Sequence, residues 1–307
     1  MKLAASSGVG RATGELRAAL SKAVARLEEC GVPSAPLAAE LLLMHVLRRD
    51  RAWLYAHPEY ELSLDETAAY AEVVERRSQG APTQYLTGRQ EFWGLEFEVG
   101  PGVLIPRPET EHVIEVALER LGPRRSQTLR VADVGTGSGC IAIALAHELP
   151  QAQIVATDIS PAALDYAQRN ARRHLVLGRI QFCEANLLTA HSDAPGWAKG
   201  PFDLIVSNPP YVGRSDAPGL PREVREHEPA EALFAGDRGV DFYPGLIDEA
   251  ARALSPDGIF VTEIGYNGAE YVRSLLAAPL WSDPCVTRDL IGIERVISAR
   301  RAVNQAS

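Results

Sequence analysis

Four consecutive residues, Asn208, Pro209, Pro210 and Tyr211, follow the apolar run FDLIVS. A strand terminator needs only one proline, whereas two prolines restrict the backbone on both sides of Pro209 and hold its carbonyl in one direction. The Asn208 amide offers a second acceptor, and the Tyr211 ring offers a flat face. Two fixed acceptors could take both N–H groups of a planar nitrogen and aim its lone pair at an electrophilic carbon. The tetrapeptide therefore indicates alkyl transfer to an amide or an exocyclic amine.

A glycine-rich turn, DVGTGSG, follows a predicted strand over residues 129–134. Its glycines would let a ligand approach the backbone and would open the N-terminus of a helix. The spacing is GxGxG and differs from the GxGxxG of pyrophosphate binding, so the pattern alone is a weak signal, and a tight turn without a ligand would use the same residues. The candidate cofactor-binding residues of this turn are Gly135, Thr136, Gly137, Ser138 and Gly139.

Three further candidates lie at the ends of predicted strands. Asp158 closes the strand QIVATD, where a carboxylate can accept both hydroxyls of a ribose. Leu187, with Asn186 before it, follows the strand RIQFCEA, at the tip expected beside the adenine of a nucleoside ligand, where an asparagine at a strand end is also commonly structural. Asp133 precedes the glycine turn, where it could reach a cationic group of the ligand or cap the turn. A single aspartate at a strand end is often a turn residue, but the glycine turn before Asp158 favours binding of a nucleoside cofactor.

The elements that must position these residues follow an alternating pattern. From about residue 129, predicted strands alternate with helices, which indicates a parallel sheet covered on both faces. The strand-like runs 285–290 and 293–300 have no helix between them and predict an antiparallel edge. Residues 91–105 alternate around Gly-Pro-Gly and predict a β-hairpin. Residues 14–79 carry amphipathic helical patterns bounded by Pro or Gly and predict a small helical domain.

Composition excludes several classes of protein. The chain has 46% apolar residues, and its 31 Lys and Arg against 40 Asp and Glu give a formal charge of −9, which argues against a protein that coats nucleic acid. The four cysteines are isolated, so we expect reduced thiols and no metal site. No apolar run is long enough to cross a bilayer, and the first residues lack the apolar segment of an export signal. We therefore expect a cytoplasmic protein.

The glycine turn, Asp158 and the tetrapeptide together resemble the class I S-adenosyl-L-methionine-dependent methyltransferases, over about residues 107–300. The resemblance implies a seven-stranded Rossmann-like sheet and S-adenosyl-L-methionine as cofactor. In such enzymes the pattern [N/D]PP[Y/F/W] goes with methylation of adenine, guanine or glutamine amides. The tetrapeptide therefore leaves DNA, RNA and protein substrates open.

Longer segments resemble the HemK/PrmC family of release-factor glutamine methyltransferases. They are QY at 84–85, EFWG at 91–94, IPRPETE at 105–111 and EHEPAEALFAGDRGVDFY at 226–243. This resemblance spans nearly the whole chain and implies N5-methylation of the glutamine in the GGQ motif of class I peptide-chain release factors. It also implies a release-factor-binding helical domain over 1–88, a hairpin connector over 89–106 and a methyltransferase domain over 107–307.

The same resemblance assigns roles to the tetrapeptide. Asn208, Pro209 and Tyr211 would be catalytic, these three with Pro210 would bind the substrate glutamine, and Asn208 would also touch the cofactor. Three residues depart from the family pattern: His227 replaces a tyrosine, Arg238 an acidic residue, and Leu187 an aromatic residue against the adenine, which predicts weaker stacking there.

The segment PRPETE has two interpretations, and they stay open at the level of sequence. Pro108 and the acidic residues after it are typical of a helix N-terminus, and the segment could also form a wall on the substrate side.

Four alternatives to this function are compatible with parts of the sequence. A ribosomal-protein glutamine methyltransferase shares the tetrapeptide. A nucleic-acid N-methyltransferase would be expected to carry a target-recognition domain or a basic stripe, and neither is visible. A nicotinamide dehydrogenase is disfavoured by GxGxG and by the tetrapeptide, and a non-catalytic release-factor-binding protein by Asn208 and Asp158. We expect a monomer that acts on a protein, without membrane association or sequence-specific nucleic-acid binding.

Overall fold

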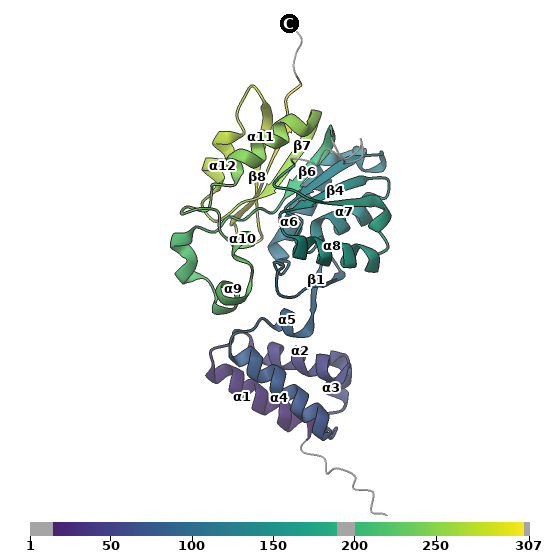
Figure 1. Ribbon diagram of the computed structural model, residues 1–307, viewed down its shortest axis with the longest axis vertical. Coiled ribbons are helices and arrows are strands. Elements are labelled where there is room, and N and C mark those ends of the chain that lie inside the picture. The colour runs from purple at the N-terminus through teal and green to yellow at the C-terminus, as the bar shows by residue number, and fades with distance from the viewer. Residues whose placement is uncertain (1–14, 189–199, 304–307) are drawn as a thin grey trace, which may run out of the picture. The chain divides into compact units, whose positions relative to one another are not determined.

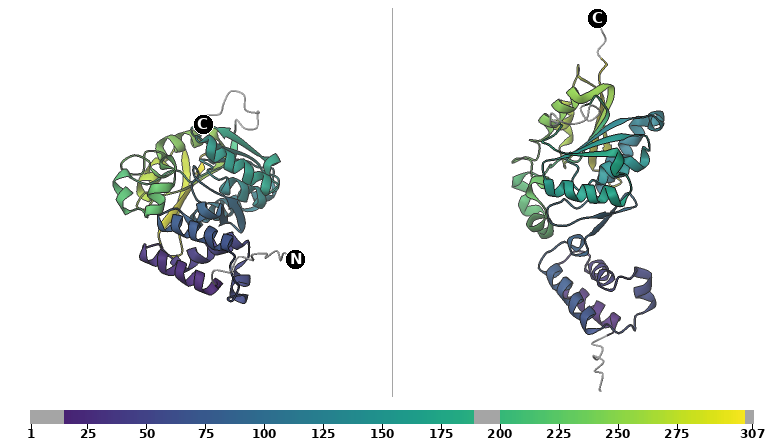
Figure 2. Two further views of the ribbon diagram at one scale, coloured as in Figure 1. Left: turned by 60° about the horizontal axis from the view of Figure 1, so that its bottom comes forward. Right: turned by 45° about the vertical axis from the view of Figure 1, so that its right-hand side comes forward.

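The computed structural model describes residues 15–188 and 200–303, and the chain divides into two compact units. One unit comprises Met1–Gly88 and Arg222–His227, and the other comprises Arg89–Pro221 and Glu228–Ser307. Figure 1 labels the elements of both units, and Figures 1 and 2 colour them along the chain. None of the helices in the described ranges is long and apolar enough to cross a membrane.

The first unit is helical, as the sequence predicts. Its helices are α1 (Leu16–Glu29), α2 (Ala35–Leu47), α3 (Arg51–Ala56), α4 (Leu64–Ser78), α5 (Thr83–Thr87) and α9 (Arg222–His227). Helix α4 begins at a capping box, in which Ser63 and Glu66 each accept a hydrogen bond from the other's backbone N–H. Leu27, Leu42 and Leu43 are fully buried in the core of this unit.

Helix α9 groups with the helical unit although it is distant in the sequence. The buried side chain of Arg77 in α4 pairs with Glu223 of α9, and Arg77 Nη1 donates to the carbonyl of Ala81 at 3.1 Å. The predicted boundaries followed chain order and put residues 222–227 with the methyltransferase domain. A long-range ion pair of this kind leaves no local signal, so the sequence could not place α9.

The second unit contains a hairpin and a seven-stranded sheet. The hairpin is formed by β1 (Arg89–Phe92) and β2 (Leu95–Glu98). The sheet has the order β5-β4-β3-β6-β7-β9-β8, with β9 and β8 antiparallel to the strands they pair with, which confirms the predicted sheet and its antiparallel edge. Its strands are β3 (Arg130–Val134), β4 (Gln153–Asp158), β5 (Ile180–Glu184), β6 (Phe202–Ser207), β7 (Leu254–Glu263), β8 (Trp281–Arg288) and β9 (Glu294–Arg301).

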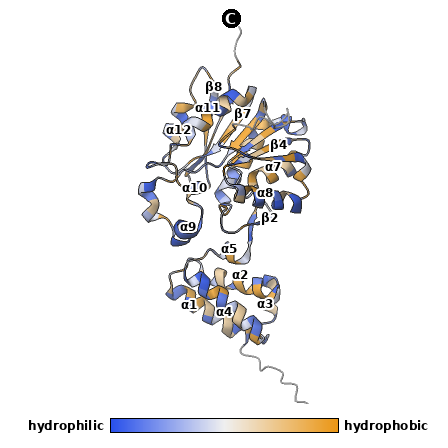
Figure 3. Ribbon diagram, in the orientation of Figure 1, coloured by the Kyte–Doolittle hydropathy of each residue, from blue (hydrophilic) through white to orange (hydrophobic). Residues whose placement is uncertain are grey.

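Helices cover both faces of this sheet, because successive side chains of each buried strand point to opposite sides. Val131 and Leu204 pack with α6 and α7 on one face, whereas Ala132 and Ile205 pack with α11 and α12 on the other. Figure 3 shows hydrophobic residues concentrated along the strands. The helices of this unit are α6 (Glu111–Leu121), α7 (Cys140–Glu148), α8 (Pro161–Arg173), α10 (Ala230–Leu233), α11 (Tyr243–Ala253) and α12 (Ala269–Leu275).

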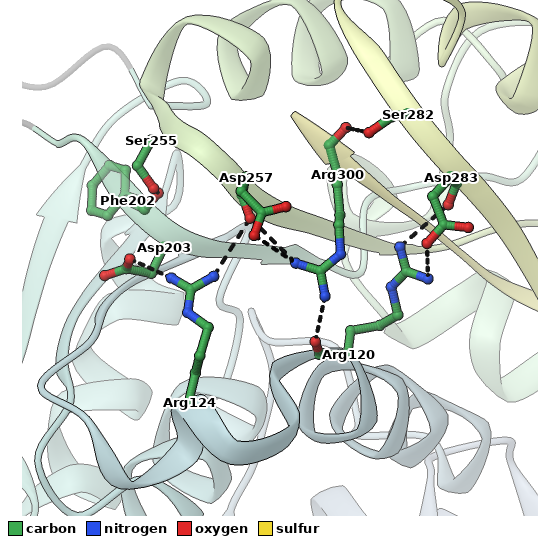
Figure 4. Close-up of polar contacts among 9 residues, drawn as sticks. All are labelled: Arg120, Arg124, Phe202, Asp203, Ser255, Asp257, Ser282, Asp283 and Arg300. Atoms are coloured by element: carbon green, nitrogen blue, oxygen red, sulfur yellow. Dashed lines mark hydrogen bonds and ion pairs between the residues drawn. The ribbon is translucent and has the colours of Figure 1, made fainter. Parts of the chain in front are cut away.

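An arginine–aspartate cluster lies at the edge of the sheet where β3 and β6 begin, and its side chains are drawn in Figure 4. Arg124 Nη2 donates to Asp203 Oδ1 at 2.7 Å, and Asp203 Oδ2 accepts from the backbone N–H of Arg130 at 2.9 Å. Arg300 donates to the Arg120 carbonyl at 2.8 Å. The cluster consists of Arg120, Arg124, Asp203, Asp257, Asp283 and Arg300, and each of its arginines pairs with one of its aspartates.

Candidate active site

A cleft opens at the other edge of the sheet, where β3, β4 and β6 end. Ligands of open α/β sheets bind at this carboxyl edge. Segments far apart in the sequence line it: residues from the loop 102–110, from the turn 134–141, from the tips of β4 and β5, from the NPPY tetrapeptide and from 229–242. The sequence-predicted strand ends are therefore brought together at one site.

The glycine turn forms one wall of this cleft. The backbone N–H groups of Gly135 and Thr136 both donate to the carbonyl of Thr157, at 2.8 and 2.9 Å. Gly137 has φ +56°, and a Cβ there would meet nothing within 4 Å, so its backbone faces open space. Gly139 has φ +83° and packs against Ala167 of α8, where a Cβ would approach within 3.1 Å. Gly135 to Ser138 line the cleft, whereas Gly139 allows α7 and α8 to pack behind it.

Asp158 also lines the cleft, at the tip of β4. Its Oδ2 accepts from the N–H of Gly137 at 2.8 Å, and its Oδ1 accepts from the N–H of Ser160 at 2.9 Å. Burial raises the pKa of this carboxyl, and the backbone N–H groups of Ser160, Gly137 and Ile159 lower it. Each oxygen keeps a further lone pair, so Asp158 can accept hydrogen bonds from two neighbouring hydroxyls.

Asp133 is fully buried and does not reach the cleft. Its Oδ2 accepts from the Thr136 hydroxyl at 2.7 Å and from the N–H of Ala142 at 3.1 Å. Among the described residues, no group hydrogen-bonds its Oδ1, and burial raises the pKa of Asp133 to about 7. Of the two roles considered from sequence, the structure shows the capping of the turn.

The tetrapeptide follows β6 and contributes Asn208 and Pro210 to the cleft, with Pro209 buried behind them. Asn208 Nδ2 donates to the hydroxyl of Thr110 at 2.9 Å. Because the amide nitrogen is engaged by Thr110, the carbonyl oxygen is the end left to accept from a ligand. A Cβ at Gly135 would lie 4.0 Å from the Asn208 carbonyl, so the glycine turn and the tetrapeptide are neighbours.

Tyr211 supports the site from behind rather than lining it. Its hydroxyl donates to Glu263 Oε1 at 2.8 Å, and burial raises its pKa well above the ordinary value. Gly239 and Gly265 crowd its backbone, and a Cβ at Gly239 would lie 2.2 Å from the Tyr211 carbonyl oxygen. Contact between Tyr211 or Pro209 and a substrate stays a prediction.

The loop before α6 forms a second wall and is held by Glu228. The buried Glu228 carboxylate accepts from the N–H of Ile105 at 3.1 Å and pairs with Arg107 at 2.5 Å. Pro108–Thr110 forms a 3-10 turn that leads into α6, and Pro106, Arg107 and Thr110 line the cleft. PRPETE is thus both a helix start and a wall.

Sequence reasoning missed part of the lining. Phe242 and Glu231 line the cleft, as does the predicted Leu187. Both missed residues lie in the segment EHEPAEALFAGDRGVDFY, whose family resemblance was the signal that could have found them. His227 and Arg238, which depart from that pattern, are exposed. Within residues 15–188 and 200–303, no group of three His, Cys, Asp or Glu could hold a metal ion.

Comparison with known proteins gives consistent matches along the chain. Residues 18–88 match the model of the PrmC N-terminal domain, and residues 125–278 match that of a methyltransferase domain. A release factor glutamine methyltransferase of Koribacter versatilis is 47% identical, covering 93% of this chain and 98% of its own. A protein of the same name from Moorella thermoacetica is 43% identical, with coverages of 93% and 98%.

The solved structures support the fold of the second unit. The hMettl16 catalytic domain superposes with a TM-score of 0.53 at 18% identity, covering 76% of this chain and 82% of its own.

Proposed function

The chain belongs to the release factor glutamine methyltransferase family, and we propose that it methylates the N5 amide nitrogen of the glutamine in the GGQ motif of class I peptide-chain release factors, with S-adenosyl-L-methionine as donor. One observation carries the proposal. The nitrogen of the Asn208 carboxamide donates to Thr110, which fixes the side chain. It lies beside the glycine turn and Asp158, the part of the cleft suited to a nucleoside. An acceptor oxygen is therefore held where a planar N–H group would meet a bound cofactor.

The residues of the cleft fit S-adenosyl-L-methionine. Asp158 would accept the ribose hydroxyls, and the open backbone at Gly137 leaves room for close approach. Leu187 and Phe242 would offer apolar surface to the adenine. The cofactor, when bound, supplies an electrophilic methyl group.

The tetrapeptide would prepare the glutamine amide, whose lone pair is delocalised and poorly nucleophilic. Asn208 Oδ1 and the Pro209 carbonyl would each accept one N–H, which turns the lone pair toward the methyl group. Such preorganised dipoles lower the barrier because they need no rearrangement during the reaction. The nitrogen becomes more acidic as the new bond forms, so its proton can leave to water without a dedicated base.

The helical unit would recognise the release factor. The match of residues 18–88 to the PrmC N-terminal domain supports this role. A separate domain would be superfluous for a tripeptide, so we expect recognition of the folded release factor rather than of a short peptide.

The test is methyl transfer with purified components. The protein is incubated with S-adenosyl-L-methionine carrying a labelled methyl group and with a class I release factor, and a release factor changed from GGQ to GGA serves as control. We expect label on the GGQ protein only, and loss of that label with the Asn208→Ala enzyme. Equal labelling of both release factors, or label in ribosomal protein, rRNA or DNA instead, would contradict the proposal.

A further inference from the structure

The side chain of Asn170, on helix α8, is buried and makes three hydrogen bonds to backbone groups of two other segments. Its Nδ2 donates to the carbonyl of Ser138 at 2.9 Å and to the carbonyl of Glu98 at 3.0 Å. Its Oδ1 accepts from the backbone N–H of Glu98 at 2.7 Å. Both N–H groups of the amide are therefore engaged, and its oxygen is too, which fixes the orientation of the carboxamide.

The first partner, Ser138, belongs to the glycine turn and lines the cleft. In a regular helix the N–H of Ala142, four residues further on, would donate to the Ser138 carbonyl. Here that N–H donates to the carboxyl of Asp133 at 3.1 Å, so the Ser138 carbonyl lies outside the hydrogen bonds of α7 and takes its donor from Asn170. Removing the Asn170 amide would leave a carbonyl of the cleft wall without this donor.

The second partner, Glu98, is the last residue of β2, where the hairpin ends. Asn170 holds both its N–H and its carbonyl, as a neighbouring strand would. From Glu98 the chain continues into the loop 102–110, whose residues form the second wall of the cleft. A Cβ at Gly102 would lie 3.4 Å from the Cβ of Ala162, so α8 also contacts the start of this loop. Asn170 therefore ties both walls of the cleft to one helix.

We propose that Asn170 is a positioning residue of the cofactor site, which holds the glycine turn and the loop 102–110 in the arrangement that binds S-adenosyl-L-methionine. Buried polar side chains whose hydrogen bonds are all made stiffen the segments they join, and binding sites depend on such support behind the residues that touch the ligand. Asn170 is not among the residues that line the cleft, so it would act through Ser138 and Glu98. The inference rests on the proposed function, since the cleft is taken as the site of this cofactor.

The experiment measures the dissociation constant of S-adenosyl-L-methionine by calorimetry for wild type and two variants. Asn170→Ala removes the ties to both walls. The matched control is His174→Ala, because His174 follows α8 and its Nε2 contacts the carbonyl of Glu96 in β2 at 2.9 Å without reaching the glycine turn. We expect Asn170→Ala to raise the dissociation constant by about tenfold, the factor that corresponds to one buried hydrogen bond. His174→Ala should leave it at the wild-type value.

Stability and kinetics separate positioning from a purely structural role. Both variants should unfold at lower urea concentration than wild type, since each loses a contact between the hairpin and the region of α8. Only Asn170→Ala should raise the KM for S-adenosyl-L-methionine, with kcat at saturating cofactor near that of wild type. If Asn170→Ala lost stability but kept the wild-type dissociation constant, or if His174→Ala raised that constant equally, the inference would be overturned.

A second variant serves if Asn170→Ala does not fold. Asn170→Ser is then compared with the same control and carries the same expectation, because its shorter side chain leaves room for a water that can satisfy the two carbonyls without fixing them. Absence of S-adenosyl-L-methionine binding by the wild-type protein would instead count against the proposed function.

Discussion

Two groups of polar residues lie at opposite edges of one sheet and are built in different ways. In the arginine–aspartate cluster each arginine pairs with an aspartate. The two oxygens of Asp203 accept from Arg124 at 2.7 Å and from the backbone N–H of Arg130 at 2.9 Å. Behind the cleft, the carboxyl of Glu263 accepts from the Tyr211 hydroxyl, and its other oxygen is buried without a hydrogen bond among the described residues. Figure 4 shows the paired arrangement of the first group.

The difference indicates what each edge does. Matched pairs at a sheet edge hold α6, β6 and β9 together and stabilise the fold. Asp133 and Glu263 are buried carboxyls with raised pKa values; they cost stability, and they lie behind the residues that line the cleft. Perturbed titratable groups beside a cleft are typical of functional sites. Substitutions at the cleft edge should therefore change kcat, and substitutions in the arginine–aspartate cluster should change the free energy of unfolding.

The largest effect is expected at Asn208. Asn208→Ala removes the oriented acceptor, and kcat for release-factor methylation should fall by about 10²–10³, as for loss of one preorganised polar group. Cofactor affinity and the free energy of unfolding should change little. Kinetics with labelled cofactor and denaturant unfolding measure these quantities, and near-normal turnover would contradict the assigned role.

A smaller effect, on stability alone, is expected for Asp203→Ala. The change removes the partner of Arg124 and leaves the N–H of Arg130 without its acceptor, so the free energy of unfolding should fall by about 1–2 kcal/mol. Both side chains are about a quarter exposed, so solvent screens part of the interaction. Urea unfolding measures this free energy. A fall in kcat of the folded Asp203→Ala variant would contradict a purely stabilising role for this edge of the sheet.

Asp133 predicts a pH dependence of stability. Its folded pKa of about 7 lies above its usual value, so the folded state holds this proton more tightly than the unfolded state. The resulting stabilisation is complete at acid pH and is lost as pH rises from about 4 to 7, by at most about 1.4 kcal/mol per pH unit. Asp133→Asn should remove this component. Denaturant unfolding of wild type and Asp133→Asn across this pH range tests the prediction. If the free energy of unfolding of the two proteins changed with pH in the same way, the raised pKa would not belong to Asp133.

The smallest effect is expected outside both groups, at the exposed pair of Arg252 and Asp248 on α11. The charged atoms are 3.9 Å apart, and the side chains are 75% and 71% exposed. Arg252→Ala should change the free energy of unfolding by less than about 0.5 kcal/mol and leave kcat unchanged. If Arg252→Ala lowered the free energy of unfolding as much as Asp203→Ala does, an exposed isolated pair would stabilise the fold as well as the arginine–aspartate cluster. That result would contradict the stabilising role assigned to the cluster.

The sequence predicted the parts of the site that depend on local pattern. Asp158 and Asn208 follow apolar strands, and a parallel sheet brings such strand ends to one edge, so both were found. Tyr211 and Gly139 pack behind the wall against Glu263 and α8, so their predicted contacts with ligands stay predictions. Thr110 was not singled out, because its contact with Asn208 joins segments 98 residues apart. Family resemblance marked the segment, but only the fold shows which side chains in it meet.

The most direct test compares the two edges in one crossed measurement. The value of kcat for release-factor methylation and the free energy of unfolding are determined side by side for wild type, Asn208→Ala and Asp203→Ala. The account predicts that Asn208→Ala loses rate at nearly wild-type stability, and that Asp203→Ala loses stability at nearly wild-type rate. If both variants lost rate and stability together, the separation of the two edges would be wrong.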